Sequence, residues 1–506
     1  MSALRSTVLL TAVGLFGQAV GFVYRVGLSR MVGSEVMGLY QLVMPAMSVM
    51  MSLTAVGFTV ACSHLTAQYR ALGNYKAARA ALRQCLLSFL TSFAVVALIA
   101  APLSDFISVK LLGDARSRLG LLLLLPCVLL TGVENIHKHA FYGANIVYPP
   151  ALTEVIEQLI RAGAVLGLLW RFLPQTPEKA VGIIVLGMIC CEVFSAVTLT
   201  LLSRRLIRQE GGEGVEVRVL GKKVRKIAFP IALTSLLGNL MGAWTAVLIP
   251  QRLVRSGCDV SAAMRSFGVL CGMTLPLLNL PTACISALGL VLLPRLSQAA
   301  ALGRQDLCRR RVSKALRGAS SLVFPACALL AVLAPRLGPA LFKESTVGAY
   351  AVPLALSVAL ASLESVLAVC LNGLGRQTSA ARNSLVCGAV QLFLTWQRMA
   401  LPGVGLRGYV EASLLSTLLG LWLNWRSVHK AISLRPDLFR WLVGPGLGSV
   451  LAGLCTNLLL PLLQGSGLSL FPACAASALF FALLYFSAMA AQGLLPRRGV
   501  DRGKKV

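Results

Sequence analysis

Acidic residues are scarce in this chain, and charged residues as a whole are fewer than a soluble protein carries. Among 506 residues there are 18 Asp and Glu, and charged residues make up 13%, against about 25% in soluble domains. Hydrophobic residues reach 57%, and the mean hydropathy is +0.78. This composition excludes an ordinary soluble domain and predicts an integral membrane protein.

The sequence also lacks the segments on which many membrane enzymes and pumps depend. No phosphate-binding G-x-x-x-x-G-K-[ST] loop occurs, which argues against nucleotide hydrolysis. The longest polar stretch, residues 203–226, is too short to be a domain, and the 14 cysteines never form C-x-x-C. Paired acidic residues with a spacing suited to acid–base or metal chemistry are missing too. We therefore expect no enzyme, no cofactor and no metal, and a transporter driven by an ion gradient or the membrane potential is the simplest class.

Basic residues, in contrast, are abundant. The chain has 47 Lys and Arg and a net charge of +29. Because such residues collect in cytoplasmic loops of membrane proteins, and no soluble basic domain is present, no nucleic-acid partner is expected. Their distribution over the loops predicts that both termini are cytoplasmic. The largest groups are Arg204, Arg205, Arg208, Lys222, Lys223, Arg225 and Lys226, and then Arg309, Arg310 and Arg311. Topology accounts for them best, and anionic lipid head groups are the alternative partner.

Hydropathy predicts an all-α protein with about fourteen membrane-spanning helices. Twelve is the alternative, because the apolar runs at 391–405 and 444–457 are short or broken by glycine. A repeat with a period of about 230 residues joins "RALGNYKAARAALR" to "AALGRQDLCRRRVSKALR". We therefore expect two six-helix lobes in parallel repeat, residues 1–215 and 216–435, followed by two helices and a basic cytoplasmic tail at 436–506.

One expected helix carries three charges. The segment "YPPALTEVIEQLIRAG", residues 148–163, places a helix start at its two prolines. Glu154, Glu157 and Arg161 then share one polar stripe. Arg161 lies near the middle of the span, where an arginine costs about 2.5–3.5 kcal/mol, so it is a candidate functional residue. A purely structural pair of Glu157 with Arg161 is the alternative.

Other ionisable residues fall inside expected spans. Arg25 lies in the first helix, where it could instead extend to the outer interface. Arginine suits a phosphate-bearing cargo because its planar group binds phosphate oxygens in pairs. The other ionisable residues inside expected spans are Glu134, His137, Lys138, His139, Glu192, Glu364 and Glu411. Each could instead be a proton or cation site, although Glu192 and Glu411 could equally form hydrogen bonds between helices.

Several motifs resemble a known family. The segments "RMVGSEVMGLYQLVMPAM", "HKHAFYGANIVYPPALTEVIEQLIR" and "ACISALGLVLLPRLSQAAALGR" are similar to those of stage V sporulation protein B and related polysaccharide-biosynthesis proteins. That family belongs to the superfamily of multidrug and toxin exporters and lipid-linked oligosaccharide flippases. The resemblance extends over most of the chain.

The resemblance implies two lobes around a central cavity that opens alternately to each side of a bacterial plasma membrane. It implies a flippase that moves undecaprenyl-diphosphate-linked saccharide, such as a peptidoglycan precursor, to the outer leaflet, with the last two helices forming a groove for the lipid tail. Proton or sodium would be the coupling ion. Two alternatives stay open, a cation-coupled drug antiporter and a non-transporting partner in cell-wall or spore-cortex assembly.

The resemblance also assigns expected roles to residues. Arg25 and Arg161 would bind the diphosphate, and Arg252 and Arg255 would receive the head group at the outer end of the seventh helix. An exposed pair in an outer loop is the alternative for these last two. The carboxylates expected to gate or couple transport are Glu134, Glu154, Glu157 and Glu364.

Overall fold

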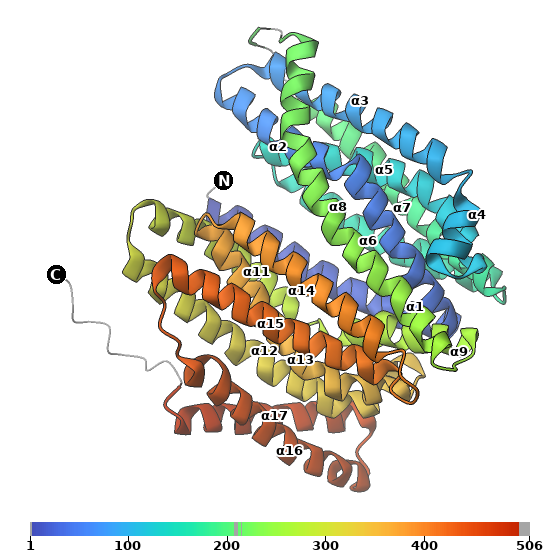
Figure 1. Ribbon diagram of the computed structural model, residues 1–506, viewed down its shortest axis with the longest axis vertical. Coiled ribbons are helices and arrows are strands. Elements are labelled where there is room, and N and C mark those ends of the chain that lie inside the picture. Colours follow the sequence, from blue (N-terminus) through green and yellow to red (C-terminus); the bar gives the residue numbers. More distant parts are fainter. Residues whose placement is uncertain (1–2, 207–210, 214, 495–506) are drawn as a thin grey trace. The chain divides into compact units, whose positions relative to one another are not determined.

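The structure is a computed structural model that describes residues 3–206, 211–213 and 215–494. Arg208 and the expected basic tail after residue 494 lie outside the described residues. Helices make up nearly all of the described part, and no strand occurs in it, which confirms the all-α fold class (Figure 1). The helices are α1 (Ala3–Thr54), α2 (Val56–Ala71), α3 (Tyr75–Ala100), α4 (Ser104–Phe106), η1 (Ile107–Leu112), η2 (Ala115–Ser117), α5 (Arg118–Gly143), α6 (Tyr148–Phe172), α7 (Pro177–Leu206), α8 (Val217–Arg255), α9 (Val260–Phe267), η3 (Gly268–Thr274), α10 (Leu275–Leu278), α11 (Thr282–Ala301), α12 (Gln305–Phe342), α13 (Thr346–Gly373), α14 (Gln377–Arg398), α15 (Leu406–Ile432), η4 (Phe439–Val443), α16 (Gly444–Gly465) and α17 (Leu470–Ala491).

Eleven helical segments in the described part of the chain are long and apolar enough to cross a membrane. The chain is therefore a multi-pass membrane protein. Three expected spans fall on helices outside this set, α6, α14 and α15, which are 25, 22 and 27 residues long. The count of fourteen is not confirmed and stays a prediction.

The helices pack into two compact units. The first contains Met1–Met273 and Gly388–Ala412, and the second contains Thr274–Cys387 and Ser413–Val506. These boundaries differ from the lobes expected at 1–215, 216–435 and 436–506. The expected lobes follow the repeat in the sequence rather than the packing, and they stay a prediction.

The long helix α1 is two helices joined at one residue. Gly33 has φ 75° and ψ 176°, which no helix contains. Glycine adopts such a conformation readily because it has no Cβ. The break at Gly33 thus divides the 52 residues of α1 into two shorter helices.

The repeat seen in the sequence also appears in local structure. Gly73 after α2 and Gly303 after α11 have φ values of 70° and 67°. In each case the residue after the glycine donates its backbone N–H to the carbonyl five positions earlier. Asn74 donates to Tyr69 at 2.8 Å, and Arg304 donates to Ala299 at 3.1 Å. This left-handed helix ending favours glycine, which explains why the glycine of Ala-Leu-Gly recurs at both places.

Close helix packing in the first unit depends on small residues. A side chain at Gly57 of α2 would collide with the backbone carbonyl of Ala228 in α8, and one at Gly132 of α5 would collide with the Phe89 ring of α3. Phe89 and Phe141 are fully buried between these helices. Small residues allow helix backbones to approach closely inside a membrane, so α2, α3, α5 and α8 form one closely packed group.

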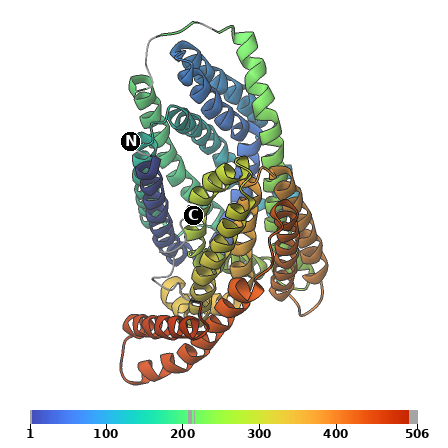
Figure 2. The ribbon, with the colours of Figure 1, turned by 90° about the vertical axis from the view of Figure 1, so that its left-hand side faces the viewer.

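In the second unit, the last two helices form a hairpin that attaches to α12. Helices α16 and α17, red in Figure 2, run side by side. The Tyr485 hydroxyl of α17 donates a hydrogen bond of 3.2 Å to the Ser321 carbonyl of α12. Arg317 of α12 also donates to the Leu494 carbonyl just after α17. The hairpin is thus part of the second unit.

Candidate functional site

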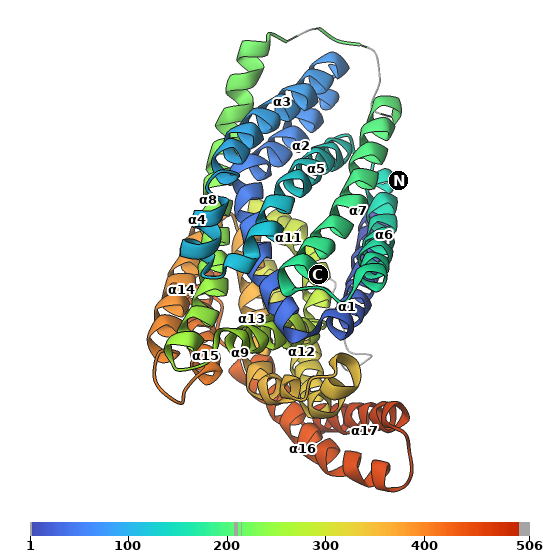
Figure 3. The same cartoon turned by 90° about the vertical axis from the view of Figure 1, so that its right-hand side faces the viewer.

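The charged helix of the first unit begins where the sequence predicts. Helix α6 starts at Tyr148, with proline in its first turn and no acidic residue there. It packs between α1 and α7, and α7 in turn packs along α5 (Figures 1 and 3). The stripe on α6 therefore meets protein on both sides.

Three carboxylates and two cations from α5, α6 and α7 form one buried cluster, which we call the Arg161 cluster. Its members are Glu134, Lys138, Glu157, Arg161 and Glu192. The three glutamates are 2–5% exposed. All lie within the first unit.

Arg161 connects two helices in this cluster. Its Nη2 lies 2.5 Å from Glu157 Oε1 and 3.1 Å from Glu192 Oε1. Lys138 connects the other pair, with its Nζ 2.6 Å from Glu134 Oε1 and 3.6 Å from Glu157 Oε2. Because removal of one partner leaves a buried charge, such pairs are costly to break. Glu157, which contacts both cations, is the centre of the cluster.

The cluster also contains three possible metal ligands. One ligand atom each of Glu157, Cys191 and Glu192 lie within 4.8 Å of one another. However, Arg161 lies among them, and its Nε donates a 3.4 Å hydrogen bond to Cys191 Sγ. The guanidinium group supplies the positive charge that a metal would bring, so these residues do not fit a metal centre as they are placed.

Arg25 of α1 lies beside this cluster without an ion pair. Helix α1 packs against α6, and Tyr24 and Tyr40 lie within electrostatic range of both Arg25 and Arg161. Arg25 is partly exposed. It makes no hydrogen bond or ion pair with a carboxylate in the described part of the chain.

The other expected site residues lie elsewhere. Glu154 is partly buried near Lys138. Glu364 belongs to the second unit, where its carboxylate fills the space at Gly420 of α15. Arg252 is 8% exposed and lies 4.6 Å from the centroid of the Trp396 ring, a cation–π contact. Its neighbour Arg255 is exposed.

Two members of the Arg161 cluster, Lys138 and Glu192, were predicted only as embedded ionisable residues and had no assigned role in the cargo or gating site. Lys138 follows Glu134 by four residues on one helix, as Arg161 follows Glu157. That spacing and order favour ion pairs; they indicated the pair of Glu157 with Arg161 and could have indicated this pair as well. Glu192 has no such local partner, and only the packing of α6 against α7 brings it to Arg161.

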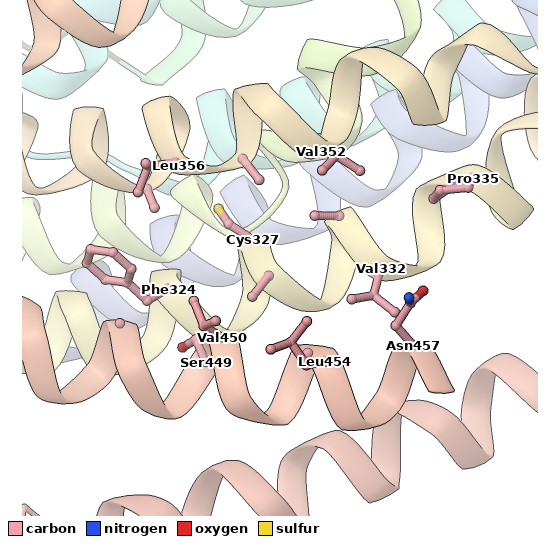
Figure 4. A pocket seen from close by; sticks show the side chains of 16 residues that line it. Phe324, Cys327, Val332, Pro335, Val352, Leu356, Ser449, Val450, Leu454 and Asn457 are labelled. Atoms are coloured by element: carbon pink, nitrogen blue, oxygen red, sulfur yellow. The ribbon is translucent and has the colours of Figure 1, made fainter. Parts of the chain in front are cut away.

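An apolar groove lies in the second unit between α12, α13 and α16. Its volume is about 430 Å³, and Figure 4 shows side chains of the three helices converging on it. Asn457 lies at one end, and the hydroxyl of Ser449 is used within its own helix, at 2.6 Å from the Pro445 carbonyl. The remaining labelled residues are Phe324, Cys327, Val332, Pro335, Val352, Leu356, Val450 and Leu454.

Comparison with known proteins decides the family. The family model for polysaccharide biosynthesis proteins matches residues 3–300, more than half of the chain. The chain belongs to this family. Stage V sporulation protein B of Bacillus subtilis (strain 168) is 26% identical over 446 residues, which cover 85% of this chain and 84% of that protein. The expected resemblance is confirmed.

Two solved structures share the fold of this polysaccharide biosynthesis protein. Lipid II flippase MurJ in its inward closed conformation matches with a TM-score of 0.71 at 12% identity, over 96% of this chain and 98% of that one. An inward-facing multidrug resistance transporter of the MATE family, from the MOP superfamily, matches with a TM-score of 0.63 at 14% identity. It covers 83% of this chain, and this chain covers 98% of it. The fold is thus that of these all-helical transporters.

Proposed function

We propose that this protein is a flippase, not an enzyme. It carries an anionic, lipid-linked saccharide from the inner to the outer leaflet of a bacterial plasma membrane, by alternating access. The saccharide hangs from a lipid diphosphate of the undecaprenyl type, and both termini of the protein are cytoplasmic. The family match and the similarity to stage V sporulation protein B support a role in making cell-surface polysaccharide.

The observation that carries this proposal is Arg25. An arginine within a membrane helix is costly when it has no partner, and Arg25 has no carboxylate partner among the described residues. Arg161, close by, is already held by two glutamates. A diphosphate that binds Arg25 and then draws Arg161 from its glutamates would supply the missing negative charge.

The extent of the structural match supports a lipid cargo. The flippase covers 96% of this chain, whereas the MATE transporter covers 83%. The apolar groove against α16 adds a surface that suits a hydrocarbon chain better than a soluble drug. The groove therefore receives the lipid tail in this proposal.

The carboxylates of the Arg161 cluster suit coupling. Glu157 and Glu192 hold Arg161 while no cargo is bound, and Glu134 and Glu154 lie near Lys138. When a diphosphate takes Arg161, the released carboxylates need a proton or a sodium ion, because a bare buried charge is unfavourable. This exchange links cargo movement to an ion gradient.

A cation-coupled drug antiporter is the second candidate. The fold likeness to MATE transporters and the buried glutamates favour it. An antiporter would need a different binding site from that of a flippase, because a cationic drug needs free carboxylates and is repelled by Arg25.

The test is translocation of a fluorescent undecaprenyl-diphosphate saccharide between leaflets of proteoliposomes. We expect Arg25→Gln to abolish translocation while the protein stays folded, and Arg161→Lys to reduce it. The control is Arg171→Gln, which removes an exposed arginine at the end of α6. Normal translocation by Arg25→Gln would refute its role in diphosphate binding.

A further inference from the structure

A basic pocket lies in the second unit between α14 and α15, apart from the Arg161 cluster and from the apolar groove. The two helices lie side by side (Figures 1 and 3). The pocket has a volume of about 380 Å³. It is lined by Arg376, Ser379, Arg382, Asn383, Trp422, Leu423, Arg426, Ser427 and Lys430.

The spacing of these residues places them on one face of each helix, and that face lines the pocket. Ser379 and Arg382 are three residues apart at the start of α14. Arg426 and Lys430 are four residues apart at the end of α15. Such neighbours lie on one helix face. The pocket is thus built by two facing helix surfaces and is more than a basic loop.

A buried amide network fixes the base of the pocket. Asn383 and Asn424 are 2% and 3% exposed. The Nδ2 of Asn383 donates hydrogen bonds to Asn424 Oδ1 at 2.9 Å and to Ser427 Oγ at 3.1 Å. Ser427 in turn donates to the Leu423 carbonyl at 2.9 Å. Buried polar groups that are bonded in this way hold the two helices in register.

The four cations of the pocket have no acidic partner. Arg376, Arg382, Arg426 and Lys430 form no ion pair with any carboxylate in the part of the chain that the structure describes, although Arg426 lies over the Trp422 ring. All four are exposed. Membrane topology requires basic residues at this end of the helices but not their convergence on one hollow. Like charges gathered without counter-charge favour an anion.

An apolar stripe continues from the pocket along α15. Leu415, Leu418 and Trp422 are 51%, 45% and 49% exposed, and their spacing of three and four residues places them on one helix face. Arg426 and Lys430 continue this line by steps of four. A charged end followed by an exposed apolar stripe matches an amphipathic ligand better than a soluble anion.

We propose that the pocket between α14 and α15 binds the phosphate head group of an anionic membrane phospholipid, whose acyl chains lie along the α15 stripe. Arg382 and Arg426 hold the phosphate oxygens from opposite helices, and the Ser379 hydroxyl donates a further hydrogen bond. This assignment does not depend on the proposed transport function. It adds a phospholipid site to the diphosphate site that is proposed at Arg25 and Arg161.

The test is lipid binding by the purified full-length protein, followed by native mass spectrometry. The wild type should bind phosphatidylglycerol at least about tenfold more tightly than phosphatidylcholine, about 1.4 kcal/mol. A variant in which all four cations of the pocket become Gln should lose this preference. The matched control changes the same number of exposed cations outside the pocket, Arg204, Arg205, Lys222 and Lys226, to Gln, and should keep it.

Three results would overturn the proposal. Equal loss in both fourfold variants would mean general attraction to basic loops. Displacement of the lipid by millimolar glycerol phosphate would mean a site for soluble phosphate compounds. If the fourfold variant fails to fold, the single change Arg426→Gln at an exposed position decides, and an unchanged lipid preference in that variant would refute the site.

Discussion

Replacement of Arg161 by methionine tests the charge arrangement of the Arg161 cluster. The change keeps much of the side-chain volume and removes the charge. Glu192 then loses its ion pair at 3.1 Å, and Glu157 loses one at 2.5 Å but keeps Lys138 at 3.6 Å. Removal of one partner of a buried ion pair costs about 3–5 kcal/mol. We expect a loss of unfolding free energy of this size.

The assay is thermal unfolding in detergent with a thiol-reactive fluorophore. Most of the 14 cysteines are buried in the structure, so unfolding exposes many reactive thiols. Arg171→Met, at an exposed position of the same helix, is the control. Its unfolding free energy should lie within about 0.5 kcal/mol of that of the wild type.

A double-mutant cycle separates the pair from general damage to the helix. Arg161→Met combined with Glu192→Gln should cost about 1–3 kcal/mol less than the sum of the single changes, because residues in one ion-pair network are coupled. Glu411→Gln, whose ion pair is with Arg398 at 2.8 Å, should add to Arg161→Met within about 0.5 kcal/mol. Additive effects of Arg161 and Glu192 would refute the cluster.

Other predictions follow from packing and from the proposed transport. Gly57→Ala should lower the melting temperature in the same assay, because the new Cβ would meet the Ala228 carbonyl. Gly21→Ala, at a position with open space around it, should leave the unfolding free energy unchanged or raise it by about 0.5–1 kcal/mol. Equal effects of the two changes would contradict this packing. Gly453→Leu places a large side chain in the apolar groove. In proteoliposomes it should slow translocation of a long-chain lipid-linked saccharide but not that of a short-chain analogue. Equal slowing of both would contradict binding of the lipid tail in the groove. Glu192→Gln should make translocation less sensitive to an imposed proton or sodium gradient, because Glu192 is one of the two carboxylates that Arg161 releases. Unchanged sensitivity would place coupling elsewhere.

The sequence was sufficient for features that are local or compositional. Hydropathy predicted an all-helical membrane protein, and the two prolines predicted the start of α6 at Tyr148. The pair of Glu157 and Arg161 was also visible, because residues four apart on a helix meet regardless of the rest of the fold. The sequence repeat likewise joined two places, at Gly73 and Gly303, that have the same backbone geometry.

Features that depend on packing between distant segments were not visible. Glu192 joins Arg161 from 31 positions away, and no periodicity within one helix reveals which face meets which neighbour. Arg252 was expected to receive the head group or to belong to an exposed pair, and its contact with Trp396 joins segments that lie 144 positions apart in the sequence. The division into two units is of the same kind, because it separates residues within α14 and α15 that are adjacent in the chain.

The most direct test of the central claim is a comparison of two cargoes in one wild-type preparation. Proteoliposomes would receive a fluorescent undecaprenyl-diphosphate saccharide or a cationic dye, and the movement of each across the membrane would be followed with and without an ion gradient. The account predicts protein-dependent movement of the lipid and none of the dye. Dye movement without lipid movement would contradict it and identify a cation antiporter.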